Sequence, residues 1–152
     1  MNTPDVCVRT EIAAEAMDIW SAVADPRRIT EWLPESTSVR CDVQGPLPVG
    51  ATVSGSNRNG LRQWSTKCRV IESDPGQAFA VDVTFMGMPV ARWPYEISES
   101  PDGPVVEEQW RERRGVLLRI VGPLSTGVAD RRAHNEAGMK VTLAALKAGI
   151  EV

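Results

Sequence analysis

The 152-residue sequence lacks any long apolar segment, and it is poor in the residues that build metal or disulfide sites. No run approaches the roughly 18 consecutive apolar residues of a membrane span, so we expect no transmembrane helix. Residues 1–5 lack the basic and apolar regions of a secretory signal, which favours a cytoplasmic location. His134 is the sole histidine, and Cys7, Cys41 and Cys68 follow no zinc-ligand or redox spacing. We therefore predict buried thiols, no metal site and no cofactor.

A strong charge imbalance is also missing. The formal net charge is −3, and the longest basic cluster, Arg111, Arg113 and Arg114, is interrupted by Glu112. Nucleic-acid binding favours a basic stripe, so we expect no nucleic-acid partner. The sequence has no phosphate-binding glycine loop, dinucleotide fingerprint or nucleophile elbow. These absences argue against nucleotide cofactors and against a serine-hydrolase mechanism.

Hydrophobic periodicity in the first part of the chain predicts one strand and two short helices. Residues 6–12 alternate, with Val6 and Val8 on one face, which is typical of a strand. The period becomes helical over residues 15–24. Pro26 then suits the first turn of a second helix over residues 27–33, since proline needs no amide donor there.

Strand signals without helical ones continue over the next eighty residues. The predicted strands cover residues 38–43, 51–57, 63–73, 79–85 and 91–97, and a last one runs through 106–110. Val39, Cys41 and Val43 share a face of the first of these. Asn59–Gly60 predicts a tight hairpin. Pro94 cannot donate to a ladder, so it predicts an edge strand or a bulge; an exposed edge would also allow a homodimer.

The last forty residues return to apolar and helical patterns. Residues 116–121 form an apolar connector closed by Gly122–Pro123, which we interpret either as a simple docked segment or as a movable gate. Residues 127–149 are predicted to form one long helix. Its inward stripe would contain Val128, Arg131 or Arg132, Asn135, Met139, Thr142 with Leu143, Leu146 and Ile150.

The element order predicts an α+β fold in a single domain covering residues 1–152. Strands joined by tight turns form an antiparallel meander. We expect a seven-stranded curved sheet wrapped around the long C-terminal helix, with two short helices between strands 1 and 2. A curved sheet and a helix seldom meet fully, so a cavity between them is expected.

The ordered markers resemble the SRPBCC (START/Bet v1-like) superfamily, in particular its bacterial polyketide cyclase/dehydrase-like members. The resemblance spans essentially the whole chain, and its markers include Asp25–Pro26, Trp64, Trp93–Pro94–Tyr95, Trp110 and Gly138–Met139. It implies a helix-grip fold and a hydrophobic cavity. The superfamily includes lipid carriers, hormone receptors, aromatase/cyclases, chaperone activators and toxin-like proteins, so the resemblance does not fix function.

The residues on the predicted inward faces form the candidate ligand-binding set. An aromatic wall can stack on a planar or sterol-like ligand, although plain core packing would use the same residues. The candidates are Trp64, Phe79, Val81, Phe85, Trp93, Tyr95, Trp110, Arg131, Asn135 and Met139.

Glu108 lies between Val106 and Trp110 on the inward face of the last strand. A buried carboxylate needs a partner or a raised pKa, and Arg131, Arg132 or Asn135 is the expected partner. The pair could be structural, could anchor a polar group of a ligand, or could make Glu108 a catalytic acid or base. A one-residue shift in register would place Glu107 inside instead.

Two further polar residues receive a less specific interpretation. Asn57 is close to the predicted pocket, but we favour its placement at the start of the Asn57–Gly60 turn. His134 is predicted to lie on the surface or the side of the helix.

Three functions fit these observations. The first is binding of an apolar small molecule, lipid-like or of polyketide/aromatic type. The second is a cyclase/dehydratase-type enzyme that uses Glu108 in the same cavity. The third is a toxin-like or other protein-interaction role, which an exposed apolar patch without a cavity would favour.

Overall fold

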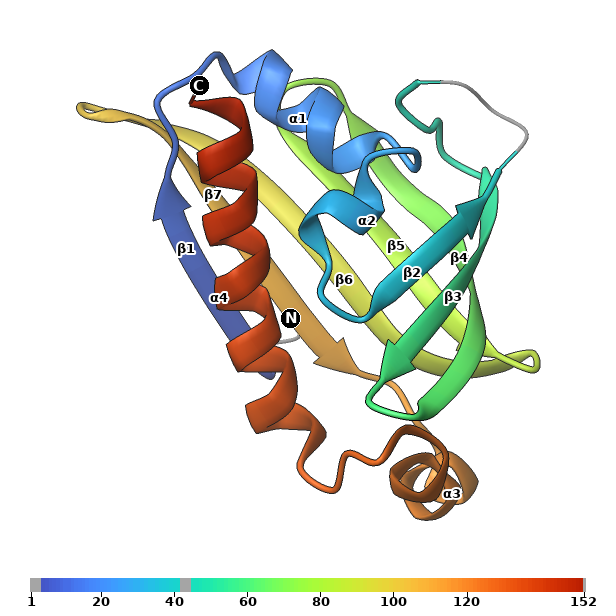
Figure 1. Ribbon diagram of the computed structural model, residues 1–152. Helices are drawn as coiled ribbons and strands as arrows, with labels where there is room; N and C mark the ends of the chain where they lie inside the picture. The colour runs from blue at the N-terminus through green and yellow to red at the C-terminus, as the bar shows by residue number, and fades with distance from the viewer. Residues whose placement is uncertain (1–3, 42–44, 152) are drawn as a thin grey trace.

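A computed structural model describes residues 4–41 and 45–151, which form one seven-stranded antiparallel sheet and four helices. The sheet curves around the C-terminal helix (Figure 1), which confirms the predicted helix-grip arrangement. The strands are β1 (Val6–Glu11), β2 (Ser36–Arg40), β3 (Thr52–Asn59), β4 (Arg62–Asp74), β5 (Ala78–Phe85), β6 (Met88–Ser100) and β7 (Gly103–Glu112). The helices are α1 (Ala16–Ala24), α2 (Ile29–Trp32), α3 (Val116–Thr126) and α4 (Arg131–Ile150).

The sheet order is β1-β7-β6-β5-β4-β3-β2, so β2 to β7 form a meander and β1 closes on the last strand. In the β1–β7 ladder, Val8 lies opposite Glu108. Side chains directly opposite each other in an antiparallel pair share a face. The first strand therefore carries Val6 and Val8 onto the same inner face as Glu108 and Trp110.

The prediction of an edge strand or a bulge at Pro94 is wrong, because β6 lies inside the sheet between β5 and β7 and no register shift occurs at Pro94. Strand β6 pairs with β7 at Arg92–Arg111 and again at Tyr95–Glu108, and the register before Pro94 is the same as the register after it. Pro94 itself pairs with Ala80 on β5. A single missing donor is thus tolerated where both neighbouring strands hold the chain in place.

Helix α4 supplies the apolar side that the sheet surrounds. Its buried residues are Asn135, Met139, Thr142, Leu143 and Leu146, a stripe at helical spacing. Leu143 and Leu146 join a core cluster with Ile19 and Trp20 of α1. The indole Nε1 of Trp20 donates to the carbonyl oxygen of Ala78 at 2.9 Å, which satisfies its one polar atom.

The segment predicted as an apolar connector is instead the helix α3, and the long helix begins four residues later than expected. Gly127 ends α3 in the left-handed conformation, with φ of 74°, and its amide donates to the carbonyl oxygen of Pro123. Asp130 then caps α4, since its side chain accepts from the amide of Ala133 at 3.1 Å. Pro123 is therefore inside the last turn of a helix, where the sequence had suggested a break.

Smaller differences concern the second strand and the cysteines. Strand β2 starts two residues earlier than predicted, and Val43 lies outside the described residues. Helix α2 is shorter than predicted and has no side-chain cap. Cys7 is exposed, so its predicted burial is wrong; the alternation that turns Val6 and Val8 inward turns Cys7 outward.

Two glycines of α4 should respond in opposite ways to alanine. A Cβ atom at Gly149 would lie 2.7 Å from Cζ3 of the buried Trp32, whereas one at Gly138 would meet Cγ of Pro34 at 3.6 Å. We expect Gly149→Ala to destabilise the fold by about 1–3 kcal/mol through overpacking. Gly138→Ala should stabilise it by about 0.5–1 kcal/mol, since alanine favours the helix. Thermal unfolding followed by circular dichroism measures both; a rise in Tm for both variants would contradict the packing of α2 on α4.

Candidate functional site

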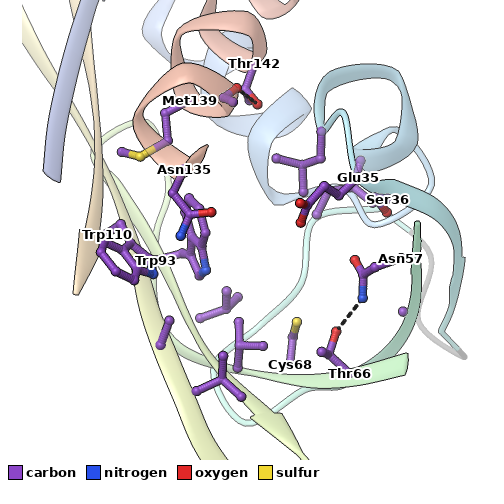
Figure 2. Close-up of a pocket in the computed structure, with 18 of the residues that line it drawn as sticks. Glu35, Ser36, Asn57, Thr66, Cys68, Trp93, Trp110, Asn135, Met139 and Thr142 are labelled. Atoms are coloured by element: carbon purple, nitrogen blue, oxygen red, sulfur yellow. Dashed lines mark hydrogen bonds between the residues drawn. The ribbon is translucent and has the colours of Figure 1, made fainter. Parts of the chain in front are cut away.

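A pocket of about 280 Å³ lies between the inner face of the sheet and α4. Figure 2 shows Trp93, Trp110, Asn135 and Met139 on one side of it, and Glu35, Ser36 and Asn57 on the other. Every residue proposed for the site from the sequence lines this pocket. These are Trp64, Phe79, Val81, Phe85, Trp93, Tyr95, Glu108, Trp110, Arg131, Asn135 and Met139.

The wall nearest α4 is apolar and closely packed. Trp110 and Met139 belong to one buried cluster, and Trp93 packs against it (Figure 2). Trp110 lies on β7, Trp93 on β6 and Met139 on α4, so three elements supply this wall. An apolar or aromatic ligand surface would find large, rigid side chains here.

Glu108 is the most deeply buried ionisable residue of the pocket, with no exposed surface. Its partner is not on α4 as predicted: the hydroxyl of Tyr95, which lies directly opposite on β6, donates to Oε2 at 2.9 Å. Arg131 instead pairs with Glu35, and Arg132 is exposed. The partner comes from the neighbouring strand and not from α4, because the register places Tyr95 on the same face as Glu108.

Burial raises the pKa of Glu108 to about 8, although the hydrogen bond from Tyr95 partly opposes this shift. Burial and the nearby carboxyl group likewise raise the pKa of Tyr95. At pH 7 Glu108 is therefore mainly a neutral acid. Its second oxygen, Oε1, is buried without a hydrogen-bond partner. A protonated Oε1 can donate a hydrogen bond to a group that enters the pocket.

The adjacent Glu107 faces the other way. It accepts from Sγ of Cys7 at 2.6 Å and from Nη2 of Arg9 at 3.3 Å on the outer side of the sheet. The register is thus the one in which Glu108, and not Glu107, faces the pocket.

A second polar group lies where α4 meets the start of β2. Nη1 of Arg131 donates to Oε1 and Oε2 of Glu35 at 3.2 and 3.3 Å, and to Oδ1 of Asn135 at 3.3 Å. The guanidinium carbon also lies 5.9 Å from the centre of the Trp64 ring. Arg131 is thus held by a carboxylate, an amide and an aromatic face at the edge of the pocket.

Glu35 and His134 are site residues that the sequence reasoning missed. The His134 ring contacts the Glu35 carboxylate through Nε2, and both residues line the pocket. His134 does lie on the side of α4, but it belongs to the pocket and not to the outer surface alone. The available signal was the spacing of His134, three residues after Arg131, which places both on one side of the helix.

Asn57 belongs to the pocket and not to a turn, so the favoured interpretation of this residue is wrong. Strand β3 continues to Asn59, and Nδ2 of Asn57 donates to Oγ1 of Thr66 at 3.1 Å (Figure 2). Cys68 lines the pocket beside them, and burial raises the pKa of its thiol to about 11. This thiol is a weakly polar part of the wall and not a nucleophile at neutral pH.

The arrangement can bind an apolar body and recognise a polar group at either of two places. Glu108 offers a neutral hydrogen-bond donor deep in the pocket, and the Arg131–Glu35–His134 group offers charge nearer its edge. Among residues 4–41 and 45–151, no three His, Cys, Asp or Glu residues lie close enough to hold a metal ion. The carboxyl groups of Glu108 and Glu35 and the imidazole of His134 are side chains of the kind that take part in acid–base chemistry.

A family model described as polyketide cyclase/dehydrase and lipid transport matches residues 3–151. A search of curated proteins gave no significant match.

Similar folds occur among solved structures. The Polyketide_cyc-like protein Cgl2372 from Corynebacterium glutamicum is 26% identical, with a TM-score of 0.65 and coverage of 100% of this chain and 94% of that one. CV1439 from Chromobacterium violaceum is 16% identical, with a TM-score of 0.71 and coverage of 97% and 96%. The di-domain ARO/CYC protein StfQ of the steffimycin biosynthetic pathway is 13% identical, with a TM-score of 0.75.

The relative lengths differ among these structures. The alignment with StfQ includes 96% of this chain but only 50% of StfQ. It likewise spans 47% of DynU16, a protein of the dynemicin biosynthetic locus, with 17% identity and a TM-score of 0.66. These similarities below 25% identity show the common fold.

Proposed function

The chain belongs to the polyketide cyclase/dehydrase and lipid transport family, and on this basis we propose that its pocket binds an apolar small molecule, lipid-like or of polyketide/aromatic type. The supporting observation is the pocket itself, whose walls are mainly aromatic and aliphatic and whose deepest polar group is Glu108. Small-molecule sites combine an apolar lining with a few placed polar groups in this way. We propose that residues 1–152 act as a single domain in this role.

The ten candidate ligand-binding residues have distinct roles in this proposal. Trp93, Trp110 and Met139 contact the apolar body of the ligand. Arg131 and Asn135 orient a polar group near the edge of the pocket, and Tyr95 holds Glu108 in position. The remaining contacts come from Trp64, Phe79, Val81 and Phe85.

Native mass spectrometry of the purified protein, followed by denaturation and identification of any released compound, tests this proposal. We expect an apolar compound at about one per chain. A pocket-filling variant adds a second readout: Val83 lines the pocket and lies opposite Cys68 and Ala91, so Val83→Trp should abolish uptake of the identified compound. Thr84→Trp, at the next position and outside the pocket lining, is the matched control.

The proposal would be overturned by a specific result. If no compound co-purifies and a panel of fatty acids and aromatic polyketides fails to bind the wild type, the pocket is not a binding site for this class. Equal uptake by Val83→Trp and the wild type would place the ligand elsewhere on the molecule.

A cyclase/dehydratase-type activity is the second candidate, and the unpartnered Oε1 of Glu108 favours it. As a neutral acid, Glu108 can pass its proton to a ketone oxygen of a bound substrate while the carboxylate takes the proton that the adjacent carbon loses. This exchange converts the ketone into an enol, the nucleophile needed for ring closure, and restores the acid.

The two candidates make different predictions for Glu108→Gln with the compound identified above. A binding protein should keep its affinity to within a few-fold, since glutamine also donates a hydrogen bond. An enzyme should lose its turnover by roughly 100-fold or more while still binding. Its rate should also fall above pH 8, where Glu108 ionises. Unchanged turnover in the variant would exclude the catalytic assignment.

A further inference from the structure

Helix α3 exposes most of its large apolar residues. Val116, Leu117, Ile120 and Leu124 are all at least 60% exposed, and they lie on one side of the helix. Leu118 is on the opposite side, where it is buried and lines the pocket. A core helix would turn its only apolar side inward. Helix α3 instead has two apolar sides, one that lines the pocket and one that is exposed to solvent.

The β3–β4 and β5–β6 hairpins turn at the same end of the molecule as α3 (Figure 1), and each exposes an apolar side chain at its tip. Leu61, between β3 and β4, is 95% exposed. Its hairpin is fixed to α3, because Nε of Arg62 donates to the carbonyl oxygen of Leu124 at 3.0 Å and Nδ2 of Asn59 donates to that of Thr126 at 2.9 Å.

Met86, between β5 and β6, is the other exposed tip. Its φ is 50°, a left-handed conformation that is unfavourable for a side chain of this kind. Glycine or asparagine would adopt this turn conformation more readily and would expose less apolar surface. A large apolar residue at such a position indicates a role for the side chain itself.

The charge of this end is opposite to that of the whole chain. Residues 57–63, 84–91 and 113–129 contain five arginines and no Asp or Glu. Two of the five are paired with carboxylates just outside these segments, Arg113 with Asp82 and Arg114 with Glu112, which leaves three arginines without an acidic partner here. Backbone carbonyl oxygens accept hydrogen bonds from Arg58, Arg62 and Arg119. These acceptors carry no formal charge, so they do not neutralise the three guanidinium groups. We name these three segments the apolar-basic end.

We propose that the apolar-basic end docks on the surface of an anionic lipid bilayer, with the exposed side of α3 and the tips Leu61 and Met86 inserted among the headgroups. Large apolar side chains with flanking arginines are the combination that binds such an interface. Several separate apolar protrusions suit a bilayer, which deforms around each of them. None of the helices in the described parts of the chain is long and apolar enough to cross a membrane.

This docking would place one end of the pocket at the bilayer. Leu118, Val121 and Ser125 of α3 line the pocket, while the other side of the same helix would contact lipid. A small shift of α3 would then open a path between pocket and membrane. The docking itself does not depend on the ligand proposal, since it concerns the outer side of the helix.

Flotation of the intact protein with lipid vesicles tests the proposal. We expect binding to vesicles of phosphatidylcholine mixed with phosphatidylglycerol, weak binding to phosphatidylcholine alone, and release at high salt. The double variant Leu117→Gln/Ile120→Gln should weaken the partition coefficient by about tenfold or more. Val141→Gln, at an exposed apolar position on α4, is the matched control and should bind as the wild type does.

A second variant keeps the test decisive if the double variant is poorly folded. Arg119→Gln should weaken binding to the anionic vesicles about fivefold and leave the weak binding to phosphatidylcholine unchanged. Absence of binding, equal binding to both vesicle types, or wild-type binding by both α3 variants would overturn the proposal. A wild-type dimer that the double variant makes monomeric, without vesicle binding, would instead assign this end to contact between two copies of the chain.

Discussion

The effect of Glu108→Gln on the free energy of unfolding is expected to be more favourable at pH 8 than at pH 4, by roughly 4 kcal/mol. The cause is burial, which raises the pKa of Glu108 from 4.5 to about 8 in the folded protein. An ionised carboxylate at this position would be out of contact with water, and glutamine avoids that charge. Urea unfolding of both proteins at pH 4, 6 and 8 measures the difference.

The direction follows from the protons that each state binds. Between pH 4.5 and 8 the folded protein keeps a proton on Glu108 that the unfolded chain has lost, so the contribution of this group falls as the pH rises through that interval. Below pH 4.5 Glu108 is protonated in both states, and its contribution to the free energy of unfolding is at its maximum. Glutamine cannot titrate, so the stability of the variant should depend less steeply on pH.

Glu107→Gln is the matched control, because this residue lies next in the same strand but faces outward with Arg9. The free energy of unfolding of the Glu107→Gln variant should change with pH as that of the wild type does. Parallel curves for Glu108→Gln and the wild type would mean that water reaches the Glu108 carboxyl group, and would remove the neutral donor from the proposed site.

Alternation in the sequence was sufficient to predict the inner face of the sheet. Val106 and Trp110 flank Glu108 at a spacing of two, and burying both requires that Glu108 lies on the same side. A shift of one residue would have placed Glu107 inside but exposed Trp110. The carboxyl position could therefore be predicted because large apolar neighbours fix the register.

Helix α3 could not be predicted, because Gly122–Pro123 suggested the end of a short segment. Pro123 lies within the last turn although it removes one amide donor of the helix, and Gly127 provides the actual end of the helix. Pro94 misled for a similar reason, since its missing donor is tolerated inside a long central strand. In both cases the neighbouring structure outweighs the local preference of proline.

The partners of the polar residues depend on tertiary structure and lay beyond the sequence. Glu35 follows α2, and nothing in its own surroundings indicates that it meets Arg131 and His134, about a hundred residues later. Likewise, Tyr95 became the partner of Glu108 through the register of two strands. The residues selected from sequence patterns line the pocket, but Glu35 and His134 line it too and were missed, and the patterns could not decide which side chains pair.

Truncation of Leu143 is expected to reduce the free energy of unfolding by about 3 kcal/mol, because its side chain fills the space between α4 and the core residues of α1 and the sheet. Leu143 is 2% exposed, so alanine would leave a cavity as well as lose apolar contact. This loss is a large part of the roughly 5–15 kcal/mol that stabilises a typical domain. Urea unfolding at pH 6 measures it.

Val141→Ala is the control for this change, since Val141 lies two positions away on the same helix but is 54% exposed. Its effect should stay within about 0.5 kcal/mol. A loss below about 1 kcal/mol for Leu143→Ala would mean that α4 is not firmly packed between sheet and α1. The wall of the pocket formed by Asn135 and Met139 depends on the same packing, because these residues lie on the same side of α4 as Leu143. The stability of Leu143→Ala therefore tests the framework on which both the ligand site and its proposed chemistry depend.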